Sequence, residues 1–400
     1  MSTQAASRLL LKPRKARPFF GRHPWVLDSA VGQVEGGPAD GDVVELFSDR
    51  GEWIARGLYN SHSRIRLRLY TWQADEVLDE AFWRRRITAA LARRAALSEP
   101  ANQAMRLIFS EADGLSGLIV DRYGNYLVVQ VTALAIAQRI KPFVDLLAEL
   151  VQPRGVLVRC DREILRLEGF QAAIGDDANW GEPPAGPIFI EEHGIRYGVD
   201  LSAGQKTGFF LDQRENRRVA AGYLRGRRVL DLFCYSGGFA LSALRLGGAA
   251  EVLAIDSSPQ AIALAKANAE LNEIAHVRFE CGDAFRWLES LAASGKRFGG
   301  VVLDPPKFAR RRQAVDEALR AYYKLNRMAL DVLEPGGTLV TCSCSGHVSR
   351  EDFLHMLAEV AQQSQRDIQI LEQRGAAPDH PTSASCLESE YLKCFICRVD

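Results

Sequence analysis

The sequence predicts an α/β protein, with a C-terminal domain built on a mostly parallel sheet after a small β-rich module and a central α+β domain. Between residues 227 and 400, apolar β-type segments alternate with helical segments, which is the pattern of successive βαβ units. Residues 1–75 hold short β-type segments separated by turn residues. Residues 175–187 are rich in Gly, Pro and Asp without an apolar period, which indicates a boundary. We therefore expect domains at residues 1–75, 76–187 and 188–400.

The composition is that of a folded chain with balanced charge. Of the 400 residues 47% are hydrophobic, and 50 Lys and Arg residues balance 50 Asp and Glu residues, so net charge identifies no partner. No run of 18 apolar residues occurs and no apolar run follows the basic N-terminus, so we expect neither a membrane span nor a secretory signal. The 8 cysteines lack a disulfide-like spacing, which favours reduced thiols and a cytoplasmic location. The oligomeric state stays open, with a homodimer among the options.

The N-terminal β-rich module is expected to have strands at residues 43–47, 53–59 and 64–70. Arginine and aliphatic residues alternate along the last strand, which places three arginines on one face: Arg64, Arg66 and Arg68. Such a row is either a solvated outer face or a strip that contacts phosphates. Residues 1–25 hold basic and aromatic side chains but no acid, and this pattern favours RNA as the partner.

The central domain is expected to hold a helix at residues 78–97, a hairpin at 118–131 that turns at Gly124-Asn125, a helix at 135–150 and a strand at 155–160. Its chemistry is not legible from the sequence.

The C-terminal domain opens with a predicted hairpin at residues 188–201. Five strands follow, separated by helices such as 259–271: residues 228–233, 251–256, 276–280, 300–304 and 338–342. If these strands are parallel, their carboxyl ends meet at one edge of the sheet, where open α/β sheets bind ligands.

The fourth of these strands ends in a carboxylate on a stiff turn. Residues 301–303 are apolar, and Asp304-Pro305-Pro306 follows. Because proline lacks an N–H and fixes φ, neither a central strand nor a helix continues through this segment. Asp304 is therefore expected at the ligand-binding edge.

Carboxylates also lie at the carboxyl ends of the first three strands, at Asp231, Asp256 and, just past the third strand, Asp283. One after the second strand can accept hydrogen bonds from ribose hydroxyls, and one after the third can accept from the adenine amine, although a single Asp there often only caps a helix. Gly237-Gly238 is not a G-x-G-x-x-G motif, which disfavours a dinucleotide. The pattern indicates a nucleoside without phosphates, and S-adenosylmethionine fits. The residues expected to bind it are Asp231, Phe233, Ser236, Gly237, Asp256, Ser257, Asp283, Ala284 and Asp304.

These motifs resemble those of class I S-adenosylmethionine-dependent methyltransferases, whose catalytic domain is Rossmann-like. Residues 205–217, 379–381 and 390–393 resemble signatures of one branch, the bacterial large-subunit ribosomal RNA cytosine-C5 methyltransferases. Members of that branch carry an N-terminal PUA domain, and residues 23–26 are similar to its opening. The resemblance covers nearly the whole chain. It implies a PUA-like barrel at residues 1–75, S-adenosylmethionine as cofactor and 23S ribosomal RNA as substrate.

The same resemblance implies the chemistry. In cytosine-C5 methyltransferases a thiolate adds to C6 of the base and makes C5 nucleophilic. Aligned from Gly336-Gly337, Cys344 takes the position of that nucleophile, whereas Cys342 is expected inside the strand as a structural residue. Asp304 would hold the N3/N4 edge of the cytosine. Many of these enzymes carry Pro-Cys after this aspartate, but here the sequence is Asp304-Pro305-Pro306.

Two alternatives stay open. Asp-Pro-Pro also occurs in enzymes that methylate exocyclic amines, so an N-methyltransferase acting on an amine or ring nitrogen of a nucleic-acid base is one. A non-catalytic RNA-binding ribosome assembly factor is the other. Lys307 and Arg310, beside the turn, are candidates for RNA contact. Cys394 and Cys397 lie in a predicted strand, where this spacing points their thiols to opposite faces, so no metal is expected.

Overall fold

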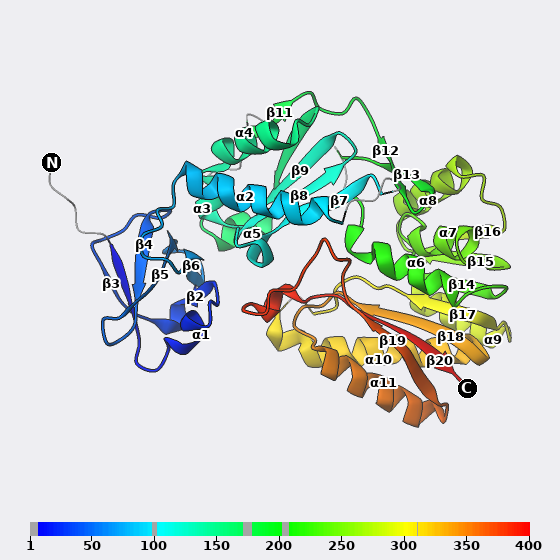
Figure 1. The fold of residues 1–400 in the computed structure, drawn as a ribbon. Coiled ribbons are helices and arrows are strands. Elements are labelled where there is room, and N and C mark those ends of the chain that lie inside the picture. The colour runs from blue at the N-terminus through cyan, green and yellow to red at the C-terminus, as the bar shows by residue number, and fades with distance from the viewer. Residues whose placement is uncertain (1–6, 98–101, 171–177, 202–207, 310) are drawn as a thin grey trace. The chain divides into compact units, whose positions relative to one another are not determined.

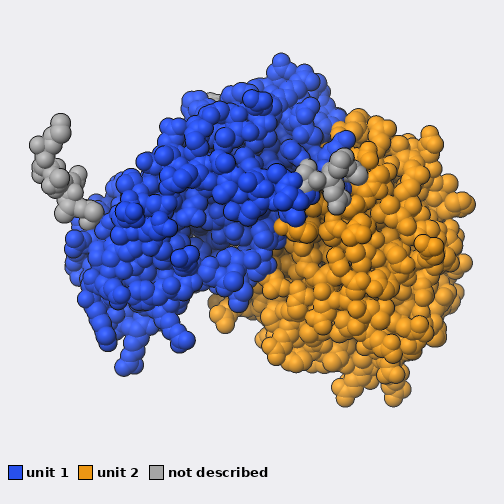
Figure 2. All heavy atoms as spheres, in the orientation of Figure 1, with its two compact units in different colours: residues 1–188, 200–208, 379–389 blue, residues 189–199, 209–378, 390–400 orange. Residues whose placement is uncertain are grey.

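The computed structural model describes residues 7–97, 102–170, 178–201, 208–309 and 311–400. The chain divides into two compact units, which Figure 2 colours separately. Unit 1 comprises residues 1–188, 200–208 and 379–389, and unit 2 comprises residues 189–199, 209–378 and 390–400. Unit 1 carries two separate sheets and two hydrophobic clusters, and the cluster of the second sheet also includes Leu58 and Tyr70 of the first. The predicted domain boundary near residue 75 lies between these sheets and stays a prediction.

The first sheet of unit 1 has six strands in the order β2-β6-β5-β4-β1-β3. All neighbouring strands are antiparallel except β1 and β4, which are parallel. The predicted strands 43–47 and 53–59 are confirmed, and the third is shifted by one residue. The elements are β1 (Arg8–Leu11), α1 (Arg17–Phe20), β2 (Trp25–Leu27), β3 (Val31–Glu35), β4 (Val43–Phe47), β5 (Trp53–Tyr59) and β6 (Ile65–Thr71).

The second sheet of unit 1 has five strands in the order β11-β10-β9-β8-β7. The predicted hairpin is confirmed as β8 and β9. The single helix predicted at 135–150 is wrong, because two helices, α3 and α4, occupy this stretch. Pro142 lies in the first turn of α4, where proline is tolerated, and it would break a longer helix. The elements are α2 (Glu80–Ala95), β7 (Ala104–Phe109), β8 (Leu118–Tyr123), β9 (Tyr126–Val131), α3 (Leu134–Ala137), α4 (Ile140–Val151), β10 (Gly155–Cys160), α5 (Arg162–Leu167) and β11 (Trp180–Gly181).

Unit 2 is built on a seven-stranded sheet in the order β16-β15-β14-β17-β18-β20-β19. The first five strands in this order are parallel, and β20 runs antiparallel to both of its neighbours. The hairpin of β12 (Ile188–Glu192) and β13 (Ile195–Val199) precedes it. The other elements are α6 (Arg214–Gly222), β14 (Arg228–Leu232), α7 (Gly238–Arg245), β15 (Glu251–Asp256), α8 (Pro259–Leu271), β16 (Val277–Cys281), α9 (Ala284–Ala293), β17 (Phe298–Leu303), α10 (Val315–Val332), β18 (Leu333–Ser343), α11 (Arg350–Ser364), β19 (Ile368–Arg374) and β20 (Lys393–Val399).

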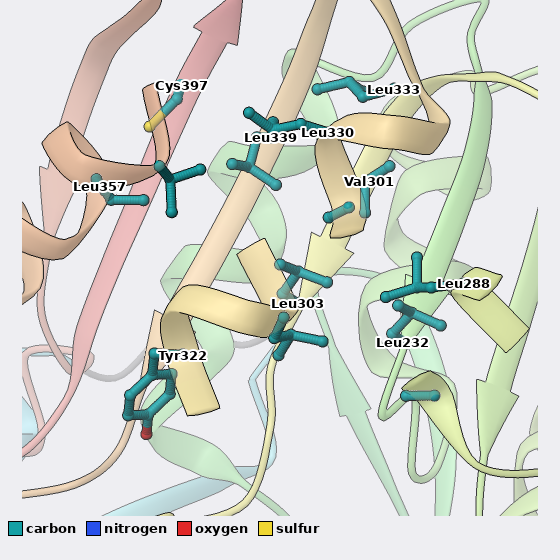
Figure 3. Packing of buried hydrophobic residues seen from close by; sticks show 14 of the residues in the cluster. Leu232, Leu288, Val301, Leu303, Tyr322, Leu330, Leu333, Leu339, Leu357 and Cys397 are labelled. Carbon is teal, nitrogen blue, oxygen red and sulfur yellow. The ribbon is translucent and has the colours of Figure 1, made fainter. Parts of the chain in front are cut away.

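Helices cover both faces of this sheet: α6, α7 and α8 lie on one side, and α9, α10 and α11 on the other (Figure 1). Figure 3 shows the core on the second side, where Val301 and Leu303 of β17 and Leu339 of β18 lie near Tyr322 and Leu330 of α10. All five are buried. Because β17 is apolar on both faces, it suits the centre of a covered parallel sheet. The order of strands reverses at β14, so the residues after β14 and β17 meet at the point where such sheets bind ligands.

Candidate active site

Carboxylates converge at the carboxyl edge of the sheet in unit 2. Asp231, in β14, is 1% exposed, and burial raises its pKa well above 3.8, with Asp304 and Asp256 adding to the effect. Burial also raises the pKa of Asp304 to about 7, with the charge of Asp212 acting in the same direction. Since neighbouring carboxylates disfavour one another's ionisation, the cluster favours a ligand that brings positive charge.

The loop between β14 and α7 has an unusual backbone conformation. Phe233 and Tyr235 have φ angles of 66° and 46°, and Gly237 has 84°. Positive φ is costly for bulky residues and is typical of functional loops. The carboxylate of Asp256 accepts hydrogen bonds from the backbone N–H groups of Tyr235 (3.0 Å) and Ser258 (2.9 Å). Asp256 therefore holds this loop against the end of β15.

The other residues predicted to bind the cofactor surround this loop. Ser236 is buried, and its carbonyl accepts a hydrogen bond from Asn268 Nδ2 (3.0 Å). Ser257 is exposed. Asp283 is exposed and caps α9, because its Oδ1 accepts a hydrogen bond from the N–H of Arg286 (3.0 Å). Ala284, the first residue of α9, is buried. A contact of Asp283 with adenine stays a prediction beside this capping role.

The Asp304 carboxylate is held by a segment that precedes α6. Gln213 Nε2 donates to Asp304 Oδ1 (2.9 Å), and Asn216 Nδ2 donates to Gln213 Oε1 (2.6 Å), which fixes the orientation of the Gln213 amide. The Tyr391 hydroxyl donates to Asp212 Oδ2 (2.5 Å). We predicted no role for Asp212 or Gln213, although both lie in the 205–217 stretch that carries the family resemblance.

Cys344 lies beside the Asp304 turn. It is the first residue after β18, and its Sγ is 3.7 Å from the carbonyl oxygen of Pro305. The next residue anchors the thiol's position, since Ser345 Oγ accepts a hydrogen bond from the N–H of Ala309 (3.2 Å) and lies 3.0 Å from the Tyr322 hydroxyl. Cys342 is fully buried inside β18, as predicted. The structure therefore brings Cys344 and Asp304 to the same end of two neighbouring strands.

A buried lysine supports the Cys344 turn, and we predicted no role for it, although it lies in the 390–393 stretch that carries the family resemblance. Lys393, the first residue of β20, is 2% exposed, and its Nζ donates to the carbonyl oxygens of Ser345 (2.7 Å), Val348 (2.7 Å) and Tyr391 (2.9 Å). Burial lowers the pKa of Lys393 to about 8, while Cys344 acts in the opposite direction. The ammonium group is thus an electrostatic neighbour of the thiol.

The residues predicted to contact RNA differ in how far they are exposed. Arg68 is 7% exposed and pairs with Glu168 (3.2 Å) and Glu111 (3.5 Å), so its assignment to a phosphate-contacting strip is wrong. Arginine and aliphatic residues do alternate along β6, but other parts of unit 1 cover the strand face that carries Arg68. Arg66 is half-buried, and Arg64 is exposed. In unit 2, Lys307 is exposed and its Nζ lies 5.8 Å from the centre of the Tyr391 ring. Arg310 lies outside the described residues.

Outside this edge, the described residues include one group with metal-ligating atoms close together: His23, Cys386 and Glu388. His23 Nδ1 accepts a hydrogen bond from the N–H of Trp25 (3.2 Å), so a neutral ring carries its proton on Nε2, which faces Glu388 (3.3 Å). Burial raises the pKa of Cys386 to about 12. Both features favour a hydrogen-bonded cluster of side chains over a metal-binding site.

No helix in the described part of the chain is long and apolar enough to cross a lipid bilayer.

S-adenosylmethionine fits the carboxylate edge of unit 2. Its ammonium and sulfonium groups are cationic, which matches the cluster of carboxylates. Asp231 Oδ1 is buried and has no hydrogen-bond partner within the described residues, so it can accept from a ligand donor. Asp256 accepts two backbone hydrogen bonds and keeps acceptor capacity for ribose hydroxyls.

Comparisons with known proteins agree with this geometry. A family model for S-adenosylmethionine-dependent methyltransferases matches residues 174–392, and a model for PUA-like domains matches residues 9–72. Ribosomal RNA large subunit methyltransferase I of Erwinia tasmaniensis is 37% identical over 395 residues, which cover 98% of this chain and 99% of the relative. The protein of the same name from Shewanella frigidimarina is 38% identical over 398 residues, which cover 98% of this chain and 100% of the relative.

Solved structures show the same fold. The crystal structure of SMU.776 complexed with SAH has a TM-score of 0.84 at 20% identity and covers 98% of this chain and 99% of that chain. An S-adenosylmethionine-dependent methyltransferase from Streptococcus mutans has a TM-score of 0.83, also at 20% identity, with the same coverage. The predicted fold class is therefore confirmed. The chain belongs to the family of S-adenosylmethionine-dependent methyltransferases with a PUA-like N-terminal domain that includes the ribosomal RNA large subunit methyltransferases I.

Proposed function

We propose that this methyltransferase transfers a methyl group from S-adenosylmethionine to C5 of a cytosine in 23S ribosomal RNA, through a covalent adduct between Cys344 and C6. The observation that carries the proposal is the position of the Cys344 thiol, 3.7 Å from the Pro305 carbonyl oxygen in the Asp304 turn. A nucleophile and a group that can hold the pyrimidine edge are thus neighbours.

Cytosine C5 is a weak nucleophile, and addition of the Cys344 thiolate to C6 makes C5 more nucleophilic. The Cys344 thiolate adds to C6 and forms an S–C6 bond, which moves electron density onto C5. When bound, S-adenosylmethionine would supply the electrophilic methyl group to C5, with cleavage of its S–CH3 bond and S-adenosylhomocysteine as the leaving group. A base removes the C5 proton, the C5–C6 double bond forms again, and the thiolate leaves. Because the thiolate is regenerated, one cysteine is sufficient for the addition and elimination.

We propose that Asp304 binds the Watson–Crick edge of the cytosine. A pKa of about 7 means that the carboxyl can carry a proton near neutral pH. In that state it can donate a hydrogen bond to N3 and accept one from the N4 amine. Protonation or hydrogen bonding at N3 draws electrons from the ring, which makes C6 a better acceptor for the thiolate. Gln213, which donates to Asp304 Oδ1, orients the carboxyl for this contact.

We assign the cofactor to the remaining carboxylates of the edge. Asp231 would accept from the ammonium group, Asp256 from the ribose hydroxyls, and Asp283 with Ala284 would contact the adenine. The positive-φ loop at Phe233–Gly237 would approach the cofactor closely with its backbone.

Ribosomal RNA as substrate rests on the printed names of the relatives, on the match to a PUA-like domain and on the basic N-terminal segment. A cytosine attacked above its ring must leave its stack, so the substrate must be single-stranded or loosened at the target. We propose a cytoplasmic location, because the ribosomal RNA substrate lies there.

The test is methyl transfer from labelled S-adenosylmethionine to in vitro transcribed 23S ribosomal RNA by the wild-type protein, C344A and C160S. Cys160, at the end of β10 in unit 1, is a half-buried thiol outside the site and serves as the control. C344A is expected to lose at least about 1,000-fold in rate, whereas C160S keeps wild-type activity. Full activity of C344A would exclude the covalent mechanism. An N-methylated product would favour the alternative that the Asp-Pro-Pro turn allows, an N-methyltransferase.

A further inference from the structure

A polar cavity of about 180 Å³ lies within unit 1, at the end of β6 and beside α2. Its volume is several times the roughly 30 Å³ that one water occupies in the liquid. The side chains that matter most in its lining are Arg22, Trp72, Gln73, Arg86 and Glu111. None of these residues belongs to the methyl-transfer site in unit 2.

Arg86 is a half-buried cation in this cavity, and no carboxylate in the described parts of the chain pairs with it. Its Nη2 donates to the carbonyl oxygen of Tyr70 (3.1 Å), and its guanidinium lies 5.0 Å from the centre of the Phe82 ring. Among the described residues no carboxylate lies within ion-pair distance of it, and Glu76, the nearest acid in electrostatic terms, pairs with Arg85 (2.9 Å). Burial lowers the pKa of Arg86, as an unneutralised guanidinium in a cavity predicts.

Other arginines increase the positive charge around Arg86. Arg85, Arg93 and Arg22 each act on Arg86 as neighbouring cations. Arg93 is engaged with Asp113 (2.7 Å), whereas Arg22 is exposed and has no carboxylate partner among the described residues. The turn that carries Arg22 is fixed by Trp72, whose Nε1 donates to the carbonyl oxygen of Phe19 (2.8 Å). Two guanidinium groups at one cavity, Arg22 and Arg86, therefore have no counter-ion among the residues that the structure describes.

The acid in the lining does not supply that counter-ion. Glu111 Oε1 accepts hydrogen bonds from Trp25 Nε1 (2.9 Å) and Ser116 Oγ (2.7 Å) and pairs with Arg68 (3.5 Å). Its charge is therefore directed away from Arg86. Gly114, at a φ of 69°, leaves room on this side, because a Cβ there would lie 3.3 Å from Arg86 Nη1. Together these contacts leave the two guanidinium groups as the charge that the cavity can offer to an anion.

We infer that this cavity binds a backbone phosphate of the RNA substrate, with Arg86 and Arg22 as its ligands. The inference rests on the proposed function, because RNA is the anionic polymer that function requires. The size suits a phosphate and part of its sugar, and the exposed Arg22 and Gln73 leave a path for the chain to continue. The half-exposed ring of Trp72 can stack on an adjoining base. Unit 1 would thus hold the RNA by a contact that carries no sequence information.

The test measures RNA binding without methyl transfer, so it stands apart from the chemistry of unit 2. Fluorescence anisotropy with a labelled 20-nucleotide cytidine-rich RNA would compare the wild-type protein with R86Q, R22Q and the matched control R84Q. Arg84 lies on the same helix but is half-exposed, and it pairs with Glu149 and Glu80. We expect R86Q to weaken binding about tenfold and to reduce the slope of log K against log salt by about 0.7, the value for one phosphate of a single strand. R84Q should change affinity less than about twofold.

R86Q changes a half-buried residue and could misfold, so R22Q tests the same cavity at an exposed residue. We expect R22Q to weaken binding about threefold. A competition arm with inorganic phosphate separates a small-anion site from an RNA site. If R86Q and R22Q bind the RNA as tightly as R84Q, with the same salt slope, the inference is wrong, even if phosphate binds. If they bind RNA weakly but the wild-type protein forms no 5-methylcytidine, the cavity assignment stands and the proposed reaction fails.

Discussion

We expect D304N to make the ligand-free protein more stable at pH 8 while it abolishes methyl transfer. Asp304 is half-buried, and burial together with the charge of Asp212 raises its pKa from 3.8 to about 7. Asparagine keeps the shape and can still accept the hydrogen bond from Gln213, but it carries no charge. The same property that suits Asp304 to a proton-sharing contact with cytosine therefore destabilises the protein without its substrate.

The magnitude follows from the two pKa values. The pKa of Asp304 is higher in the folded state than in the unfolded state. Ionisation of Asp304 therefore costs the folded protein nothing below pH 3.8, lowers the free energy of unfolding as the pH rises, and has its full effect above pH 7. At about 1.4 kcal/mol per pH unit, the full loss has an upper limit of about 4 kcal/mol, of which about 2 kcal/mol is already present at pH 5.5. D304N should therefore gain about 2 kcal/mol more at pH 8 than at pH 5.5.

Differential scanning calorimetry at these two pH values measures this gain. For a unit of this size, 1 kcal/mol corresponds to about 2–4 °C in Tm, so the advantage of D304N should grow by about 4–8 °C between pH 5.5 and pH 8. The control is D283N, an identical chemical change at an exposed residue that caps α9. A stability difference between D304N and wild type that is the same at both pH values would refute the account of Asp304.

Three further predictions address the thiol, the cofactor loop and the substrate. K393M removes the donor to three carbonyl oxygens behind Cys344, so urea unfolding should show a loss of about 2–4 kcal/mol in the free energy of unfolding. Because the neighbouring positive charge is also lost, iodoacetamide should alkylate Cys344 more slowly. Unchanged stability and unchanged alkylation would contradict this. G237A puts a side chain at φ 84° and should weaken S-adenosylmethionine binding about tenfold by calorimetry, whereas G248A, at φ 67° with open space around it, should not. Protein-free 23S ribosomal RNA should be methylated faster than assembled large subunits, because the target base must be unstacked, and equal rates would argue against this.

Local patterns predicted much of the catalytic unit. The strand at 251–256 and the helix at 259–271 were predicted with the observed bounds, because a short apolar run and a helical segment after it are properties of short stretches of sequence. The Asp304 turn was predicted for the same reason, since two prolines end a strand wherever it lies. The helix at 135–150 was predicted too long because we gave apolar periodicity more weight than Pro142.

Contacts between distant segments could not be predicted. The hydrogen bond between Gln213 and Asp304 and the role of Lys393 behind Cys344 depend on how strands far apart in the sequence are ordered. The burial of Arg68 has the same cause, because alternation identifies the face of a strand but not what covers that face. A resemblance to a family marked the stretches that hold Gln213 and Lys393 without assigning them a role.

Mass spectrometry of nucleosides from methylated RNA tests the central claim most directly. In vitro transcribed 23S ribosomal RNA would be incubated with the wild-type protein and deuterated S-adenosylmethionine, then digested to nucleosides, with C344A as the parallel reaction. We predict that the label appears in 5-methylcytidine with the wild-type protein and in no nucleoside with C344A. Label in N4-methylcytidine or in a methylated adenosine or guanosine, or an equal yield of 5-methylcytidine from C344A, would contradict the account.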